Sequence, residues 1–294
     1  MNKFPGFLLR GFSAAVLGVG VLVAFSFPSR AGDKLKPEEI VAKNLESIGT
    51  AEARSAAGSR IVGGTVVATF AEPVVGQFTG RVVLASDGYK NLLSMQFDNP
   101  NYPQEHISFN GEDVLTAFVR AGVRSNFGDL IWTYKPLLKQ GIIGGELSQA
   151  WPLYNLTDRK PKFSGSGTKK IDGRDVYVVN IVPRGGSDMT INLFFDAETF
   201  HHVRTEYQHV IETQIGVSVD SSKSQQPVRY KMIEEFGDFK KEGQLTLPHT
   251  YKITLELDAR IGRAPFRGNW DMKLDQFGFG QPIPVETFNA AGKQ

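Results

Sequence analysis

The histidines have the most specific potential chemistry in this sequence, but their spacing argues against a metal site. His201, His202 and His209 fall in one stretch predicted to be a strand. Side chains alternate between the two faces of a strand, which places His201 with His209 and leaves His202 opposite. At about 3.3 Å per residue, that pair is too far apart to share a metal ion. We predict no metal site and interpret the three as ordinary histidines of the sheet surface.

The other reactive residue types also lack a catalytic arrangement. Glu234 and Glu235 are adjacent and so point to opposite faces of a strand, while Asp196 and Glu198 fall in a turn. No Gly-x-Ser-x-Gly elbow occurs, and residues 165–167 have the composition of a turn rather than of a phosphate-binding loop. The chain has no cysteine, which excludes disulfides, thiol nucleophiles, Cys-ligated zinc and a lipid-modified N-terminal Cys. We predict a protein that is not an enzyme and needs no cofactor.

The amino-acid composition limits the classes of protein that remain. The 294 residues are 41% hydrophobic, enough for a substantial core. Charged residues make up 22%, with 33 Lys and Arg against 31 Asp and Glu, so neither sign dominates. Such a balance is untypical of disordered chains and of general nucleic-acid binders. The sequence therefore predicts a globular protein with no nucleic-acid partner.

The N-terminus has the pattern of an export signal. Lys3 and Arg10 precede the apolar run 13–27, and small residues follow at 29–31. We predict a signal peptide over residues 1–31, cleaved near Ala31, and a periplasmic protein if the source is Gram-negative. An uncleaved N-terminal membrane anchor is the alternative, because the apolar segment approaches the length of a spanning helix.

The rest of the chain is predicted to contain one leading helix followed by strands. Residues 35–49 have helical spacing, with Pro37 suited to the first turn. From residue 60 the apolar period changes to two, and turn signals separate short strands. In the second half the predicted strands are 174–183, 188–195, 201–217, 227–239, 247–258 and 266–279. Ten or eleven strands in an antiparallel meander are expected.

One segment, at about residues 121–160, breaks the strand pattern. Its apolar residues share one helical stripe: Phe127, Leu130, Ile131, Tyr134, Leu137, Leu138 and Ile142. Pro136 lies inside the stripe, so the helix is kinked there or divided, with Pro136 opening the second piece. The predicted fold class is mainly β: a curved antiparallel sheet, an incomplete and half-open barrel, with an N-terminal helix and a helical lid-like insertion.

Several motifs occur in an order and spacing that resemble a known superfamily. They are 107–112 with its Asn-Gly turn, 192–196 followed by Glu198 and Thr199, 202–207, 235–239, Gly243, 247–249 and 251–253. Over roughly residues 36–288 the chain resembles the LolA/LolB-like superfamily of outer-membrane lipoprotein-sorting proteins. The resemblance implies a single domain over residues 32–294. It also implies a concave sheet and a helical lid that enclose an apolar cavity for acyl chains.

The resemblance assigns roles that the residues alone leave open. As a periplasmic carrier or chaperone, the protein would bind acyl chains of lipids or lipoproteins and meet sorting components of the inner or outer membrane. Six residues would line the cavity: Phe127, Leu130, Ile131, Tyr134, Leu138 and Trp151. Four would form a hinge for the lid: Pro136, Gly141, Gly144 and Gly145. The alternative is an envelope scaffold in which the same side chains complete a closed core and no lipid binds.

Overall fold

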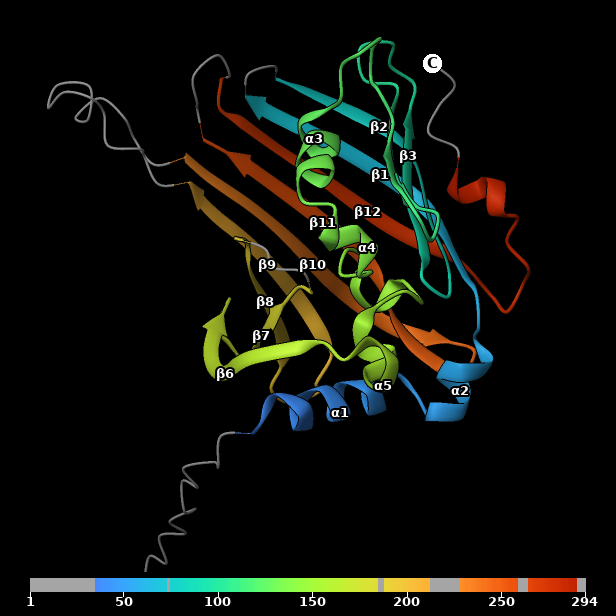
Figure 1. Ribbon diagram of the computed structural model, residues 1–294, viewed down its shortest axis with the longest axis vertical. Helices are drawn as coiled ribbons and strands as arrows, with labels where there is room; N and C mark the ends of the chain where they lie inside the picture. Colours follow the sequence, from blue (N-terminus) through green and yellow to red (C-terminus); the bar gives the residue numbers. More distant parts are fainter. Residues whose placement is uncertain (1–34, 73–74, 185–187, 212–227, 259–263, 290–294) are drawn as a thin grey trace, which may run out of the picture. The chain divides into compact units, whose positions relative to one another are not determined.

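Alternating apolar and polar residues joined by short turns produce one antiparallel sheet. The computed structural model describes residues 35–72, 75–184, 188–211, 228–258 and 264–289 (Figure 1). Its strands are β1 (Arg60–Glu72), β2 (Gly76–Asp87), β3 (Lys90–Phe97), β4 (Gln104–Phe109), β5 (Val114–Thr116), β6 (Lys162–Ile171), β7 (Arg174–Val182), β8 (Thr190–Asp196), β9 (His202–Ile211), β10 (Val228–Glu242), β11 (Leu245–Leu257) and β12 (Phe266–Phe279). The predicted signal peptide and the end of the strand predicted at 201–217 lie outside the described residues.

The order of the strands confirms the predicted fold class. It is β5-β4-β3-β2-β1-β12-β11-β10-β9-β8-β7-β6, so two meanders are joined where the first strand pairs with the last. β5 and β6 are the two edges of the described sheet, which is therefore not closed into a barrel. The sheet has one strand more than the predicted maximum. The additional strand, β5, has only three residues, too few to show a period.

The leading helix forms as predicted. α1 (Pro37–Ile48) begins at a proline in its first position, and the Glu39 carboxylate accepts a hydrogen bond from the Lys36 backbone N–H (2.7 Å). Ile40, Val41 and Ile48 are buried on its inner side. A second helix, α2 (Ala51–Ala56), follows after one turn and was not predicted, because a six-residue helix contains less than two periods.

The insertion consists of short helical pieces that cross one face of the sheet (Figure 1). They are α3 (Asn126–Thr133), α4 (Pro136–Lys139), η1 (Gly145–Leu147), η2 (Pro152–Asn155) and α5 (Leu156–Arg159). Pro136 opens the second helix, as predicted for a divided stripe. The apolar stripe residues Phe127, Leu130, Ile131, Leu137, Leu138 and Ile142 are all buried. We call the sheet face beneath the insertion the covered face and the opposite one the outer face.

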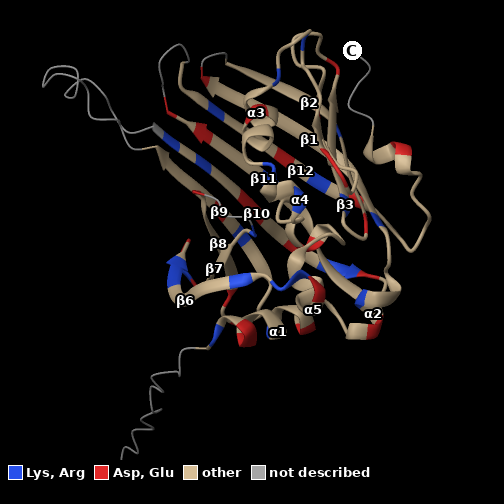
Figure 2. Cartoon of the chain, in the orientation of Figure 1, with Lys and Arg blue, Asp and Glu red and all other residues tan. Residues whose placement is uncertain are grey.

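Side chains divide between these faces with a period of two. On β12, Phe266, Trp270 and Met272 are buried on the covered face, whereas Arg267 and Asp271 are exposed on the outer face. Lys, Arg, Asp and Glu residues occur along several of the strands (Figure 2). The period of two keeps the outer face polar while the covered face supplies the core.

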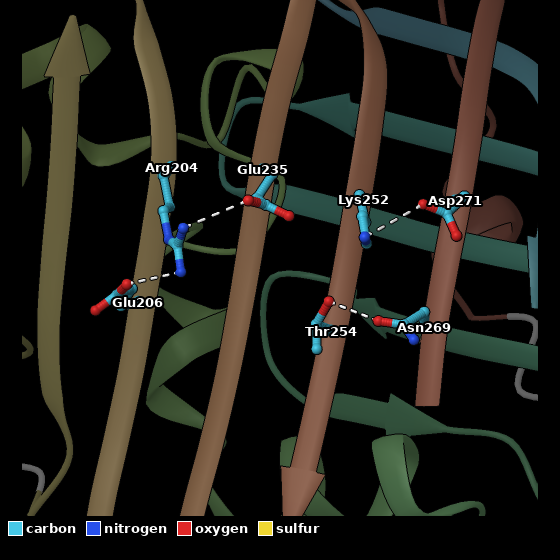
Figure 3. A network of polar contacts seen from close by, with 7 residues as sticks. All are labelled: Arg204, Glu206, Glu235, Lys252, Thr254, Asn269 and Asp271. Atoms are coloured by element: carbon cyan, nitrogen blue, oxygen red, sulfur yellow. Dashed lines mark hydrogen bonds and ion pairs between the residues drawn. The ribbon is translucent and has the colours of Figure 1, made fainter. Parts of the chain in front are cut away.

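Outer-face charges pair across neighbouring strands in the second half of the sheet (Figure 3). The Arg204 guanidinium lies 2.9 Å from the Glu206 carboxylate and 3.4 Å from that of Glu235 on β10. Lys252 on β11 lies 3.8 Å from Asp271 on β12. Such half-exposed pairs contribute little stability individually, about 0–1 kcal/mol, but favour one register over its neighbours.

The C-terminal segment covers part of the outer face of the first half. Phe288, in η3 (Val285–Phe288), is completely buried against Ala85 and Leu92. The Ser108 hydroxyl donates a hydrogen bond to the backbone oxygen of Phe288 (2.8 Å). The residues of β2, β3 and β4 thus have apolar neighbours on both sides of the sheet.

Close approach of β2 and β3 requires a glycine at position 80, which gives a stability test. A Cβ at Gly80 would overlap the Gln96 carbonyl oxygen, whereas a Cβ at Gly167 on β6 would meet nothing within 4 Å. We expect Gly80→Ala to lower the free energy of unfolding by about 1–3 kcal/mol. Gly167→Ala, the matched control, should change it by about 0.5 kcal/mol or less, or raise it slightly. Urea denaturation of both variants measures this, and equal effects would contradict the close approach.

Candidate functional site

A cavity of about 640 Å³ opens between α3 and the covered face of the sheet. Its wall contains six aromatic side chains: Phe70 from β1, Phe78 from β2, Tyr102 from the β3–β4 loop, Phe127 from α3, and Phe266 and Trp270 from β12. The pairing of β1 with β12 brings Phe70 and Trp270 together although 200 positions separate them. The volume lies within the range of pockets that hold small ligands, about 300–1,000 Å³.

Ring contacts hold the aromatic wall in a fixed arrangement. Phe70 lies edge-on to Tyr102 with ring centroids 4.8 Å apart, and edge-on to Trp270 at 5.7 Å. Phe127 packs on the other side of Trp270 at 5.1 Å. Edge-to-face pairs of this kind add about 0.5–1.5 kcal/mol each beyond the burial of area. The wall is therefore preformed and apolar.

One acid lies at the floor of this cavity within a chain of hydrogen bonds. The Trp270 indole N–H donates to the Tyr102 hydroxyl (2.8 Å), which donates to Glu105 Oε1 (2.6 Å). The Ser125 hydroxyl donates to Glu105 Oε2 (2.7 Å) and accepts from the Gly128 N–H at the start of α3 (2.8 Å). Burial raises the pKa of Glu105 to about 7, although both hydroxyl bonds favour the anion.

The mouth of the cavity has basic residues on a short hairpin. Arg120 and Val123 form an antiparallel bridge, in which the Val123 N–H donates to the Arg120 oxygen (2.8 Å). Val119 and Arg124, on either side of this bridge, also line the cavity. The opening thus combines aliphatic surface with two guanidinium groups.

Away from the cavity, a buried acid fixes the insertion to the sheet. Glu234 on β10 accepts hydrogen bonds from the Tyr207 and Tyr251 hydroxyls and from the Gly144 N–H (2.8 Å). All three side chains are completely buried. Burial raises the pKa of Glu234 despite these three donors. Loss of this carboxyl would leave the Tyr251 hydroxyl and the Gly144 N–H without a partner, a cost of about 1–3 kcal/mol for each group. The Tyr207 hydroxyl would keep only its long contact with the Ile142 oxygen (3.5 Å).

A buried arginine holds the next turn of the insertion. Arg60, only 1% exposed, donates from Nη1 to the backbone oxygen of Glu146 and to the Tyr154 hydroxyl (3.2 Å). Its guanidinium carbon also lies 5.3 Å from the Tyr154 ring centroid and 5.7 Å from that of Phe279. Burial raises the pKa of the Glu146 carboxyl to about 8, while Asn44 and the Arg60 charge act in the opposite direction. Beside these contacts, Trp151 and Tyr154 border a smaller pocket of about 360 Å³.

Of the six residues expected to line a cavity, Phe127 lies in the wall of the large one. Leu130, Ile131, Leu138 and Trp151 are at most 3% exposed and belong to the continuous core. Trp151 also lines a second, smaller pocket of about 360 Å³. Tyr134 is half-buried and its hydroxyl hydrogen-bonds with His209. A ligand-binding role for these side chains remains a prediction.

The four expected hinge residues all lie at breaks between helical pieces. Pro136 begins α4, and Gly141, Gly144 and Gly145 have positive φ angles of 68°, 83° and 49°. A Cβ at Gly145 would come within 3.0 Å of the His202 and Phe236 rings, so this turn packs tightly on the sheet. Movement about these residues remains a prediction.

The assignment of the histidines to faces was wrong. His202 is completely buried and stacks on Trp151 at 5.1 Å, so it shares the covered face with His209. The register between β8 and β9 shifts between Phe194 and Phe195, and the resulting bulge interrupts the simple alternation. Burial lowers the pKa of His202 to about 3, so this histidine is neutral and structural.

Catalytic arrangements are not found among the described residues. As predicted, Glu234 and Glu235 point to opposite faces. His106 Nδ1 lies 3.3 Å from the Ser94 hydroxyl, but its Nε2 atom has no hydrogen-bond partner in the described chain, so no acid completes a triad. The described parts also hold no group of His, Asp and Glu residues that could bind a metal, and no helix long and apolar enough to cross a membrane.

Sequence reasoning missed most of the cavity wall and its floor. Phe70, Phe266 and Trp270 stand on strands that were predicted, but their period places them on a face without saying where that face is left unfilled. Tyr102 lies just before β4 and Glu105 is the second residue of that strand, a spacing with no recognisable signal. Their connection to Trp270 requires the β1–β12 pairing.

Proteins similar to this chain are found among solved structures. No protein family model and no curated protein match this sequence. The chain is similar to a LolA superfamily protein from Nitrosomonas europaea, with 15% identity, 86% of this chain and 97% of that one covered, and a TM-score of 0.45. It is also similar to a putative outer membrane lipoprotein-sorting protein domain from Vibrio parahaemolyticus, with 14% identity, 85% and 97% covered, and a TM-score of 0.39.

A DUF1329 family protein from Desulfovibrio piger is similar as well, with 9% identity, 85% of this chain and 95% of that one covered, and a TM-score of 0.44. The first two of these proteins have names of the superfamily that the sequence motifs resemble.

The buried Glu146 carboxyl predicts a specific dependence of stability on pH. Because its pKa is raised to about 8, the folded chain keeps a proton that the unfolded chain loses near 4.5. Its contribution to the free energy of unfolding is therefore present at low pH and is lost as the pH rises from about 4.5 to about 8. We expect Glu146→Gln to flatten this decline by about 2 kcal/mol or more, measured by urea denaturation between pH 5 and pH 9. Glu198→Gln, at an exposed turn, should keep the wild-type slope; an unchanged slope in Glu146→Gln would contradict the assignment.

Proposed function

We propose that this protein is a non-enzymatic carrier that binds acyl chains of lipids or lipoproteins. The observation that supports the proposal is the cavity of about 640 Å³ with its wall of six aromatic rings. A large apolar cavity with a few polar groups at its floor and mouth suits a long apolar chain that ends in a polar group. The protein would shield such a chain from water during transfer.

The energetics of such binding are favourable without a strong polar anchor. Burial of one methylene contributes about 0.8 kcal/mol, so eight methylenes contribute about 6 kcal/mol before the costs of association. The ring wall is already ordered by its own contacts, so little conformational entropy is lost when a chain enters. Reversible binding is therefore expected, as a carrier needs.

Export completes the proposal. Residues 1–31 have the pattern of a signal peptide, which would place the mature carrier in the periplasm, between two membranes that supply and accept lipid. The sequence has no cysteine, so the carrier has no thiol for an N-terminal lipid anchor. Partners would include sorting components at either membrane.

A second candidate is an envelope scaffold with no lipid ligand. The observation in its favour is the filled part of the covered face, where Ile131, Leu138 and Trp151 are at most 2% exposed. Native mass spectrometry of protein purified from the cell envelope separates the two candidates. A co-purified lipid supports the carrier, and its absence together with no uptake of added chains supports the scaffold.

Filling part of the cavity should weaken chain binding. Val119 lines the mouth, and Val119→Trp would occupy part of the space that a chain needs. We expect the affinity for 1-dodecanol, measured by titration calorimetry below its solubility limit, to fall by about tenfold or more, as the loss of two buried methylenes would cause. Val83→Trp, at a half-exposed position on the outer face of β2, should bind as the wild type does. Equal loss in both variants, or in neither, would count against the cavity as the site.

The protonation of Glu105 should make chain binding dependent on pH. Its pKa of about 7 means that the cavity floor is neutral below that pH and charged above it. A bound chain would remove the remaining water from the charged form, so affinity should be highest below pH 7 and fall as the pH rises. We expect a decrease of about threefold to tenfold for 1-dodecanol between pH 6 and pH 8, and none in Glu105→Gln. Retention of the pH dependence in that variant would show that another group causes it.

A further inference from the structure

The two arginines at the mouth of the cavity come from one hairpin and differ in how firmly they are held. Arg120 is exposed beside the turn that ends at Val123. Arg124 follows that turn and is half-buried. Both line the cavity that we propose as the acyl-chain site.

Arg124 is fixed in place by contacts with neutral groups of the described chain. Its Nε atom donates to the Thr116 hydroxyl (2.7 Å), and Thr116 is itself buried. The guanidinium carbon lies 4.7 Å from the Phe118 ring centroid and 4.0 Å from that of Trp132. These contacts orient the guanidinium plane, while within the described chain Nη1 and Nη2 donate to no protein group.

The acids that line the same cavity do not neutralise this charge. Within the described residues no carboxylate lies within ion-pair distance of Arg120 or Arg124, although several such pairs occur elsewhere. Both oxygens of Glu105 already accept hydroxyl hydrogen bonds. Glu72, the remaining acid of the lining, is exposed at the end of β1.

We infer that the ligand of this cavity is an anionic amphiphile, whose phosphate or carboxylate group is bound by Arg124 at the mouth while its chain lies against the aromatic wall. The inference rests on the proposed function and specifies its ligand class. A guanidinium held at Nε presents its two terminal nitrogens as a fork that matches two oxygens of a phosphate or carboxylate. Arg120, on the same hairpin, adds a second positive charge at the opening.

Chain-matched ligands test the inference. Titration calorimetry at pH 6, below micelle-forming concentrations, compares dodecyl phosphate, 1-dodecanol and dodecyltrimethylammonium with the wild type. We expect the phosphate to bind about tenfold or more tightly than the alcohol, and the cation most weakly, since one charge-assisted hydrogen bond contributes about 1.5–3 kcal/mol. Arg124→Gln should remove most of this preference, bringing the affinities for dodecyl phosphate and 1-dodecanol to within about threefold of each other, while an unchanged midpoint of urea denaturation shows that the variant is folded.

Two controls define the site. Arg267→Gln removes an exposed charge from the outer face of β12, next to the cavity residue Phe266, and should keep the full preference. Inorganic phosphate alone, at millimolar concentration, should not displace dodecyl phosphate; displacement would identify a site for free phosphate and overturn the inference.

The remaining outcomes separate this inference from the proposed function. Equal binding of phosphate and alcohol by the wild type, or an intact preference in Arg124→Gln, would overturn the headgroup assignment while acyl-chain binding stands. Failure of all three ligands to bind would overturn the proposed function and the inference with it.

Discussion

An open sheet with one apolar face must have that face covered, and the rest of this structure depends on how the covering segment is attached. A single leading helix is too short to cover twelve strands, so residues of the insertion between β5 and β6 complete the core. Its short helical pieces have little stability alone. They are held by apolar burial and by polar groups beneath them, chiefly the Glu234 carboxyl under Gly144 and the Arg60 guanidinium under Glu146.

The same attachment leaves the covered face more closely packed at one end than at the other. Where η1 and η2 pack on the sheet, Trp151 is buried against Tyr154, and a smaller pocket of about 360 Å³ remains beside them. At the α3 end, aromatic rings from β1, β2 and β12 meet Phe127 from several directions.

Burial of ionisable groups is the recurring electrostatic feature of the interior. Desolvation favours the neutral form, so it raises the pKa of Glu105 and Glu146 and lowers that of His202. At Glu234 and Arg60 the buried group satisfies backbone and side-chain partners that the insertion would otherwise leave unpaired. At Glu105 the group instead borders a cavity, where a change of charge alters what the cavity can hold. Burial of an ionisable group therefore serves attachment of the insertion at Glu234 and Arg60, whereas at Glu105 we propose that it controls binding.

The sequence by itself determined the elements: a leading helix at residues 35–49, strands with a period of two, a helical stripe divided at Pro136, and motifs of the LolA/LolB-like type. These follow from local spacing, which a chain retains wherever it folds. It did not determine that His202 would be buried, because a bulge between β8 and β9 changed the alternation of side chains. Nor did it place Glu105 next to Tyr102 and Trp270, or show that no acid of the described chain pairs with Arg124. The surroundings of Glu105 and Arg124 were decided only by the pairing of β1 with β12 and by the path of the insertion, because each depends on contacts between residues far apart in the chain.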